Sequence, residues 1–203
     1  MKSGLVFSSL LFSATIGVSV SAAELDTLID SCDGCHGTDG VSQWDGVPTI
    51  AGIDPFVHSD ALWAYVDGAR PCATGPYRQG DLSRAATNMC DVSAALSEDE
   101  IEAIAEHYAA LPFVAAQQEF DPGLAASGQA VHAEQCARCH SDGGSNAADE
   151  ASIVAGQWMG YLRVTFAQYA SGEREQPAKM QEKMDALSAD DVEALIHYYA
   201  SQQ

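Results

Sequence analysis

Two short runs hold the residues best suited to chemistry, Cys32–His36 and Cys136–His140, and both read Cys-x-x-Cys-His. Two thiols three positions apart can both add to the vinyl groups of a heme, and the histidine that follows can bind the iron. The spacing therefore indicates covalent attachment of a c-type heme. One copy alone could also be a redox dithiol or half of a zinc site. Two copies predict two heme c groups, with covalent bonds to Cys32, Cys35, Cys136 and Cys139 and with His36 and His140 on the irons.

The second half of the chain repeats the first. An offset of 104 residues places 136–174 on 32–70, and an offset of 91 places Met180 on Met89 and 187–200 on 96–109. The offsets differ by 13 residues, so the first unit has a 13-residue insertion between Cys72 and Met89. We therefore expect a leader at 1–23, a first domain at 24–112, a linker at 113–121 and a second domain at 122–203.

The repeat also predicts the sixth ligand of each iron. Met89 and Met180 both stand seven residues before a Leu-Ser pair, and a thioether ligand raises the reduction potential relative to a second imidazole. Met184 is an alternative in the second unit, although the first unit has no methionine at the matching place. With His36 and Met89 on one iron and His140 and Met180 on the other, neither iron has an open position for a substrate. This arrangement favours electron transfer over catalysis.

Each unit predicts a short helix into the cysteine pair, a middle helix, a variable loop with the methionine and a closing helix. Ser97 and Ser188 each precede acidic residues, a pattern typical of a capped helix N-terminus. Apolar residues recur at 101, 104, 105 and 108, the stripe of an amphipathic helix. No strand-like alternation is present. We expect an all-α protein with two tandem domains, each wrapped around one heme.

The first 23 residues predict export. An early Lys2, an apolar stretch and small residues at 21–23 form a signal peptide, with an uncleaved anchor as the alternative. The chain has 29 acidic and 9 basic residues, a formal net charge of −20 that disfavours binding to nucleic acid. This charge could steer the protein to a basic partner or form a solvated coat. We expect a periplasmic protein that is not an integral membrane protein.

Cys72 and Cys90 are the two cysteines outside the heme motifs, and they bracket the insertion before Met89. Export into an oxidising compartment favours a disulfide between them over two free thiols. Such a bridge would hold the loop that carries Met89. A copper or other metal site on these two thiols is the remaining alternative.

At this point the chain resembles the diheme class I cytochromes c, including the c-four-like carriers and the heme subunit of flavocytochrome c sulfide dehydrogenase. The resemblance covers nearly all of residues 24–203 and rests on both heme motifs and on several motifs in the second half. Those motifs are Asp142-Gly143-Gly144, Ile153-Val154-Ala155-Gly156-Gln157-Trp158, Tyr161-Leu162, the pair Gly172 and Arg174, and the ending Tyr199-Ala200-Ser201-Gln202-Gln203. The pair Gly172 and Arg174 is a general mark of the family, whereas the other second-half motifs look most like the dehydrogenase subunit.

The resemblance implies a heterodimer with a flavoprotein subunit that binds FAD, oxidises sulfide and passes electrons to the two hemes, which then pass them to a downstream redox carrier. It also implies that Trp158, Tyr161 and Arg174 line heme edges or propionates. The sequence departs from the family in two places. The insertion after Cys72 would lie near the flavin, which puts sulfide as substrate in doubt. Ser152 also stands where the first unit has Pro48, the residue whose carbonyl orients the ligating histidine.

Three functions fit these observations. The first is the electron-accepting subunit of a flavin-linked sulfur-compound dehydrogenase, which is not catalytic alone. The second is a free diheme carrier between a membrane complex and a terminal acceptor. The third is a catalytic diheme enzyme, such as a peroxidase or a thiosulfate-oxidising cytochrome, and it requires one iron to lose Met89 or Met180.

Overall fold

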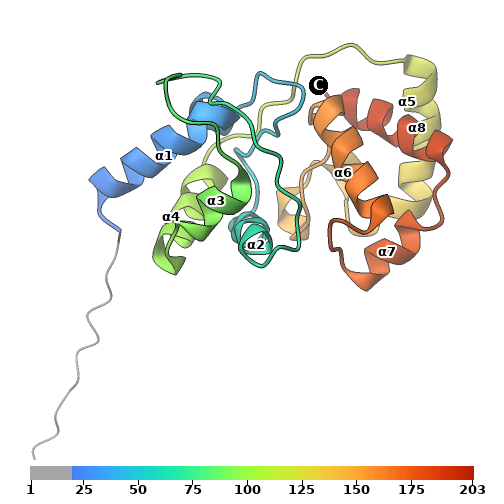
Figure 1. Ribbon diagram of the computed structural model, residues 1–203. Coiled ribbons are helices and arrows are strands. Elements are labelled where there is room, and N and C mark those ends of the chain that lie inside the picture. Colours follow the sequence, from blue (N-terminus) through green and yellow to red (C-terminus); the bar gives the residue numbers. More distant parts are fainter. Residues whose placement is uncertain (1–19) are drawn as a thin grey trace, which may run out of the picture.

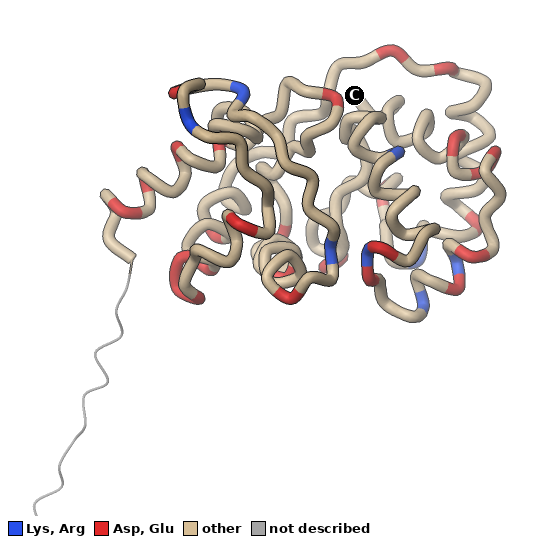
Figure 2. Tube along the Cα trace, in the orientation of Figure 1, with Lys and Arg blue, Asp and Glu red and all other residues tan. Residues whose placement is uncertain are grey.

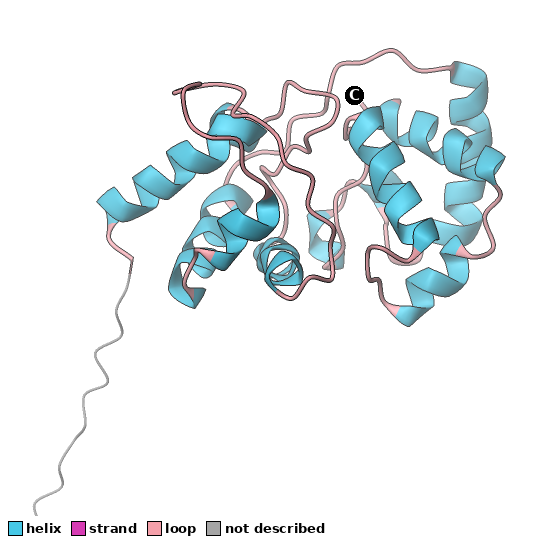
Figure 3. Ribbon diagram, in the orientation of Figure 1, coloured by secondary structure: helices cyan, strands magenta, loops and turns pink. Residues whose placement is uncertain are grey.

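The computed structural model describes residues 20–203, so most of the expected leader at 1–23 lies outside the described residues. Within them the protein is helical, and extended backbone pairs only in one isolated bridge between Gly75 and Thr87 (Figure 3). The expected all-α class is confirmed. The helices are α1 (Ala22–His36), α2 (Pro55–Val66), α3 (Met89–Ala94), α4 (Glu98–Ala109), α5 (Pro122–Val131), α6 (Met159–Ser171), α7 (Ala178–Met184) and α8 (Ala189–Ala200), with single turns η1 (Thr38–Gly40), η2 (His132–Cys136), η3 (Asp142–Gly144) and η4 (Ala147–Asp149).

Helices α1 to α4 form one group and α5 to α8 a second group beside it (Figure 1). In the first group, α2 and α4 bury an apolar core that α1 and α3 extend. The buried members are Ile50, Leu62, Ile101, Ile104 and Tyr108. Ser97 caps α4, because its hydroxyl accepts from the Glu100 N–H while the Glu100 carboxylate accepts from the Ser97 N–H. The expected start of the closing helix is therefore confirmed.

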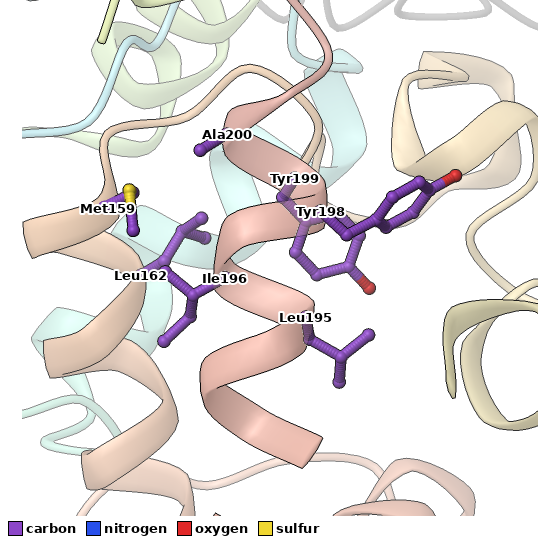
Figure 4. Packing of buried hydrophobic residues seen from close by; sticks show 7 residues of the cluster. All are labelled: Met159, Leu162, Leu195, Ile196, Tyr198, Tyr199 and Ala200. Atoms are coloured by element: carbon purple, nitrogen blue, oxygen red, sulfur yellow. The ribbon is translucent and has the colours of Figure 1, made fainter. Parts of the chain in front are cut away.

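The second group has a core of its own between α6 and α8 (Figure 4). Its buried members are Met159, Leu162, Leu195, Ile196, Tyr198, Tyr199 and Ala200. The capping box recurs at the start of α8 with Ser188 and Asp191, as the sequence predicts. Helix α5 crosses α8 at Gly128, where a side chain would meet the Ala194 carbonyl and Tyr198. Glycine is needed there because the two backbones approach closely.

The segment between the two groups, 110–121, has no helix and runs along the second group (Figure 1). Ala116 is buried and donates its N–H to the Gly156 carbonyl at 2.8 Å. The Gln118 side chain donates to the Gln157 carbonyl at 2.8 Å and accepts from the Met159 N–H at 2.9 Å. This segment is therefore packed against the second group by specific hydrogen bonds.

The two methionines expected in variable loops lie in short helices instead. Met89 is the first residue of α3, whose N-terminus is capped by the Asn88 side chain. Met180 lies in the first turn of α7, which begins directly after Pro177. The sequence pattern missed both helices because six or seven residues are too few to show a helical period.

Acidic residues are spread over both groups and basic residues are few (Figure 2). Among the described residues, no helix has both the length and the apolar character needed to cross a bilayer. Four exposed cations sit in the second group, Arg138, Arg163, Lys179 and Lys183, and two more lie in the insertion, Arg78 and Arg84.

Candidate heme sites and their interface

A cavity of about 360 Å³ opens inside the first helix group, against the face of the second. Both cysteines of the first motif line it, together with His36 at the end of α1 and Met89 at the start of α3. The structure therefore brings together the four residues that the sequence assigns to the first heme. Tyr161 and Arg174 of the second group also line this cavity.

His36 is held in the orientation that an iron ligand requires. Its Nδ1 lies 3.0 Å from the Pro48 carbonyl oxygen. Because a carbonyl can only accept, Nδ1 carries the hydrogen and Nε2 keeps its lone pair for a metal. Burial lowers the pKa of His36, so the ring stays neutral, as ligation requires.

His140 has the matching environment in the second group. Burial lowers its pKa, and a hydrogen bond to the Ser152 backbone acts in the opposite direction. A Ser152 carbonyl can orient the ring as Pro48 does for His36, because the acceptor is backbone and not side chain. Met180 is half-buried in α7, and its ligation to the second iron stays a prediction.

None of the four motif cysteines forms a disulfide within the described residues, so all four remain for heme attachment. Burial raises the pKa of Cys32 to about 12, and burial also raises the pKa of Cys35 and of Cys136. Cys139 differs from the other three because it is exposed. Cys72 and Cys90 are joined by a disulfide, with their Cα atoms 5.8 Å apart, and they close the insertion next to Met89.

The cavity contains polar atoms suited to a carboxylate-bearing ligand. His58 Nδ1 and Arg70 Nε are both buried without a hydrogen-bond partner in the described structure, and both residues line the cavity. Arg70 stacks on Tyr65 and Arg174 stacks on Tyr169, at 4.6 and 4.7 Å, and the offset of 104 relates the two pairs. No carboxylate of the described residues pairs with either arginine. The residues present fit an apolar macrocycle whose propionates need cationic partners.

The three residues that the resemblance places at heme edges fall into two groups. Tyr161 and Arg174 both line the cavity. Burial alone would raise the pKa of Tyr161, but the charges of Arg174 and Arg70 outweigh burial and lower this pKa to about 8. Trp158 instead donates its indole N–H to the Ser42 carbonyl at 2.9 Å. Trp158 therefore joins the two helix groups.

The interface between the groups is built from hydrogen bonds that the sequence analysis did not foresee. Gln157 and Thr49 are fully buried, and the Gln157 amide accepts from the Thr49 N–H at 3.1 Å and donates to the Thr49 carbonyl at 2.8 Å. Asp45 adds a second pair, because its carboxylate accepts from the Gly160 N–H and its carbonyl from the Tyr161 N–H. The 104-residue offset aligns Gln157 with Ile53. A polar residue in place of an apolar one was the sequence signal that could have indicated this contact.

Comparisons with known proteins agree with this geometry. Residues 123–198 match the family described as "Cytochrome C oxidase, cbb3-type, subunit III". The chain is 27% identical over 191 residues to the "Thiosulfate dehydrogenase electron acceptor" of Stutzerimonas stutzeri (strain A1501), with 84% of this chain and 78% of that protein covered.

Solved structures show the same fold. Reduced cytochrome c4 from Pseudomonas stutzeri superposes with a TM-score of 0.70 at 22% identity, over 90% of this chain and 99% of that one. Cytochrome c4 from Acidithiobacillus ferrooxidans gives a TM-score of 0.67 at 23% identity, over 85% and 99%. A thiosulfate dehydrogenase (TsdBA) from Marichromatium purpuratum gives a TM-score of 0.66 at 25% identity. The match covers 85% of this chain but only 36% of the dehydrogenase chain. The protein therefore has the fold of the diheme class I cytochromes c, and residues 123–198, which include the second Cys-x-x-Cys-His motif, match a cytochrome c family.

Proposed function

We propose that this protein is a diheme electron-transfer cytochrome c of the periplasm, and that it is the electron-accepting subunit of a sulfur-compound dehydrogenase. One observation carries the electron-transfer assignment: His36 and Met89 line the same cavity as both attachment cysteines. An iron held between an imidazole and a thioether has no free position for a substrate. The chain is then not catalytic alone.

Each heme, when bound, supplies a one-electron ferric–ferrous couple. The residues of the chain would attach the hemes, orient their ligands and hold the two domains together. The cysteine pair would hold the heme covalently, and the Pro48 carbonyl, which accepts from His36 Nδ1, would leave Nε2 free to bind the iron. Arg70 and Arg174, which both line the cavity, would balance the propionate charge where the two domains meet. The buried Gln157–Thr49 pair holds the domains in one arrangement, so that the distance for electron transfer stays constant.

The relative that accepts electrons from thiosulfate dehydrogenase favours a sulfur-compound dehydrogenase as the electron donor. Thiosulfate is the substrate class that this relative's name suggests. A flavoprotein with FAD that oxidises sulfide, as the sequence resemblance implies, is the second candidate for the donor subunit. Both donors would deliver electrons one at a time to the same pair of hemes.

A free diheme carrier is the alternative function, and a structural observation supports it. This chain covers 99% of each of the two cytochrome c4 chains, so the likeness in fold extends over nearly the whole of both. In that case the donor would be a membrane complex and the contact would be transient.

Export to the periplasm is part of the proposal. The Cys72–Cys90 disulfide supports it, because structural disulfides persist in oxidising compartments. The leader expected at 1–23 would be removed near Ala23, and the Ser21 cap of α1 would be lost with it.

The test is to purify the tagged protein from its native periplasm at low salt and to record its absorption spectrum together with the masses of co-purifying proteins. An equimolar flavoprotein with flavin bands supports the FAD-linked donor, and an equimolar heme enzyme that reduces this protein with thiosulfate supports the other. A monomer with two low-spin hemes and no such partner contradicts the subunit assignment and identifies a free carrier. A high-spin heme in the isolated protein contradicts the electron-transfer assignment.

A further inference from the structure

The insertion of the first domain folds over the segment that carries the first heme motif. The N–H groups of Arg78 and Gln79 both donate to the Gly34 carbonyl, at 2.7 and 3.1 Å. The Tyr77 ring lies against Gly34, where a Cβ would stand 2.7 Å from Tyr77 Cδ1. Gly34 is buried by this contact.

Three further contacts hold the insertion in place. Arg84 stacks on the outer face of Tyr77 at 3.7 Å and donates to the Ser31 hydroxyl at 2.9 Å. The Gln79 side chain donates to the Thr38 hydroxyl at 3.3 Å. The bridge between Gly75 and Thr87 closes the base of the insertion just inside the Cys72–Cys90 disulfide. Residues 73–88 therefore form a fixed cover, which we call the insertion cover.

Among residues 20–203, no inserted segment folds over the second motif, because the second unit lacks these 13 residues. Arg138 stands at the position that matches Gly34, and it is exposed. Cys139 is also exposed, whereas its counterpart Cys35 is half-buried. The two inner residues of each motif lie between the cysteines that bond the heme edge, so the burial of Gly34 under Tyr77 and the exposure of Arg138 report how accessible each attachment edge is.

We propose that the insertion cover closes the attachment edge of the first heme, so that transient redox partners exchange electrons at the attachment edge of the second domain, around Cys139. The first heme then exchanges with such partners through the second. The fitting partner is a small redox protein or complex that reaches Cys139 directly and places a negative group beside Arg138. Lys183 lies next to the same edge, 3.1 Å from the Gln135 side chain.

The two domains provide a matched pair of cations for the test. Arg78 is exposed and lies at the first motif, where its backbone N–H donates to the Gly34 carbonyl at 2.7 Å, but it belongs to the cover. Arg138 is exposed within the open motif. Reversing either charge changes the net charge of the protein by the same two units. The two arginines differ in whether a redox partner can reach the heme edge beside them.

The experiment follows the oxidation of the fully reduced diheme protein by ferricyanide, in which each ferrous iron loses one electron and ferricyanide becomes ferrocyanide. We expect Arg138→Glu to slow the reaction about three- to tenfold at low ionic strength and Arg78→Glu to change it less than about 1.5-fold. About 1 M salt should remove the effect of Arg138→Glu. Equal slowing by both variants overturns the proposal.

A second readout does not depend on electron transfer. Tyr77→Ala removes the ring from the insertion cover, and we expect amide hydrogen exchange at 32–36 to rise toward the rate at 136–140. Unchanged exchange at 32–36 overturns the proposal. The proposal rests on the diheme electron-transfer function, and the two fail differently. A protein without two low-spin hemes contradicts the function. Equal slowing by Arg78→Glu and Arg138→Glu in a protein with both hemes contradicts only electron exchange at Cys139.

Discussion

The Tyr77 ring packs on Gly34 at a distance that leaves no room for a side chain at position 34, directly before Cys35 of the first motif. The same position in the second motif carries the exposed Arg138. The insertion can therefore lie on the heme motif only because position 34 is a glycine. The inserted residues alone are not sufficient.

The first prediction exchanges these two residues. Gly34→Arg places a long side chain where Tyr77 lies, and we expect it to lower the unfolding free energy by about 1–3 kcal/mol, because inserted atoms force the neighbours apart. Arg138→Gly removes an exposed side chain and should cost less than about 1 kcal/mol. Denaturant unfolding of the heme-loaded variants measures both. Trypsin cleavage after Arg78 and Arg84 should become faster only in Gly34→Arg, and equal cleavage in both variants contradicts the packing role.

The sequence predicted those parts of the fold that depend on local signals. The caps at Ser97 and Ser188 and the apolar stripe of α4 follow from residues within one or two turns, so the closing helices were predictable. The interface was not predictable in this way. Thr49 and Gln157 lie in loops 108 residues apart, and only the folded chain shows that their amide groups meet. The fold of the insertion was hidden for the same reason, because its partner Gly34 is distant in sequence.

The second prediction concerns the axial methionines. Met89→Ala and Met180→Ala should each convert one heme to a high-spin or water-ligated form, remove half of the near-infrared absorption of methionine-bound ferric heme and lower that heme's reduction potential. Met184→Ala in α7 is the control and should leave the spectrum unchanged. If Met184→Ala removes the band and Met180→Ala does not, then Met184 is the ligand of the second iron.

The third prediction concerns the disulfide between Cys72 and Cys90. Replacing both cysteines by serine should lower the unfolding free energy by about 3 kcal/mol, because the bridge limits the unfolded chain over a loop of 18 residues. The loss should also loosen α3, so that Met89 leaves the iron at a lower temperature than in the unaltered protein. A thermal scan of the methionine–iron band checks this. A band that disappears at the same temperature in both proteins contradicts a role for the bridge in holding Met89.

The fourth prediction concerns the contact between the domains. Gln157→Ala leaves the Thr49 N–H and carbonyl buried without partners, and we expect a loss of about 3 kcal/mol in unfolding free energy. Calorimetry should then show two separate transitions where the unaltered protein shows coupled domains. Gln43→Ala is the control, because Gln43 is exposed and bonds only to the nearby Val41 carbonyl at 3.4 Å. One unchanged transition in Gln157→Ala contradicts the proposed coupling.

The last prediction is a pH dependence that originates at His132. This residue is buried, its Nδ1 lies 3.1 Å from the Tyr199 hydroxyl, and its Nε2 has no partner. Burial, assisted by the nearby His140, lowers the pKa of His132 below its ordinary value of 6.5. The folded protein therefore keeps His132 neutral at a pH where the unfolded chain binds a proton there. Stability from this group is complete above pH 6.5 and is lost as the pH falls below it.

The slope from one such group is at most about 1.4 kcal/mol for each pH unit. His132→Phe removes the titrating group, so the unfolding free energy should fall less steeply between about pH 6.5 and 5 than in the unaltered protein. The variant also loses the hydrogen bond to Tyr199, which lowers its stability by about 1 kcal/mol at every pH. The comparison is therefore between slopes and not between absolute values. Equal slopes in the two proteins would mean that the acid sensitivity arises elsewhere and that His132 already binds a proton in the folded state.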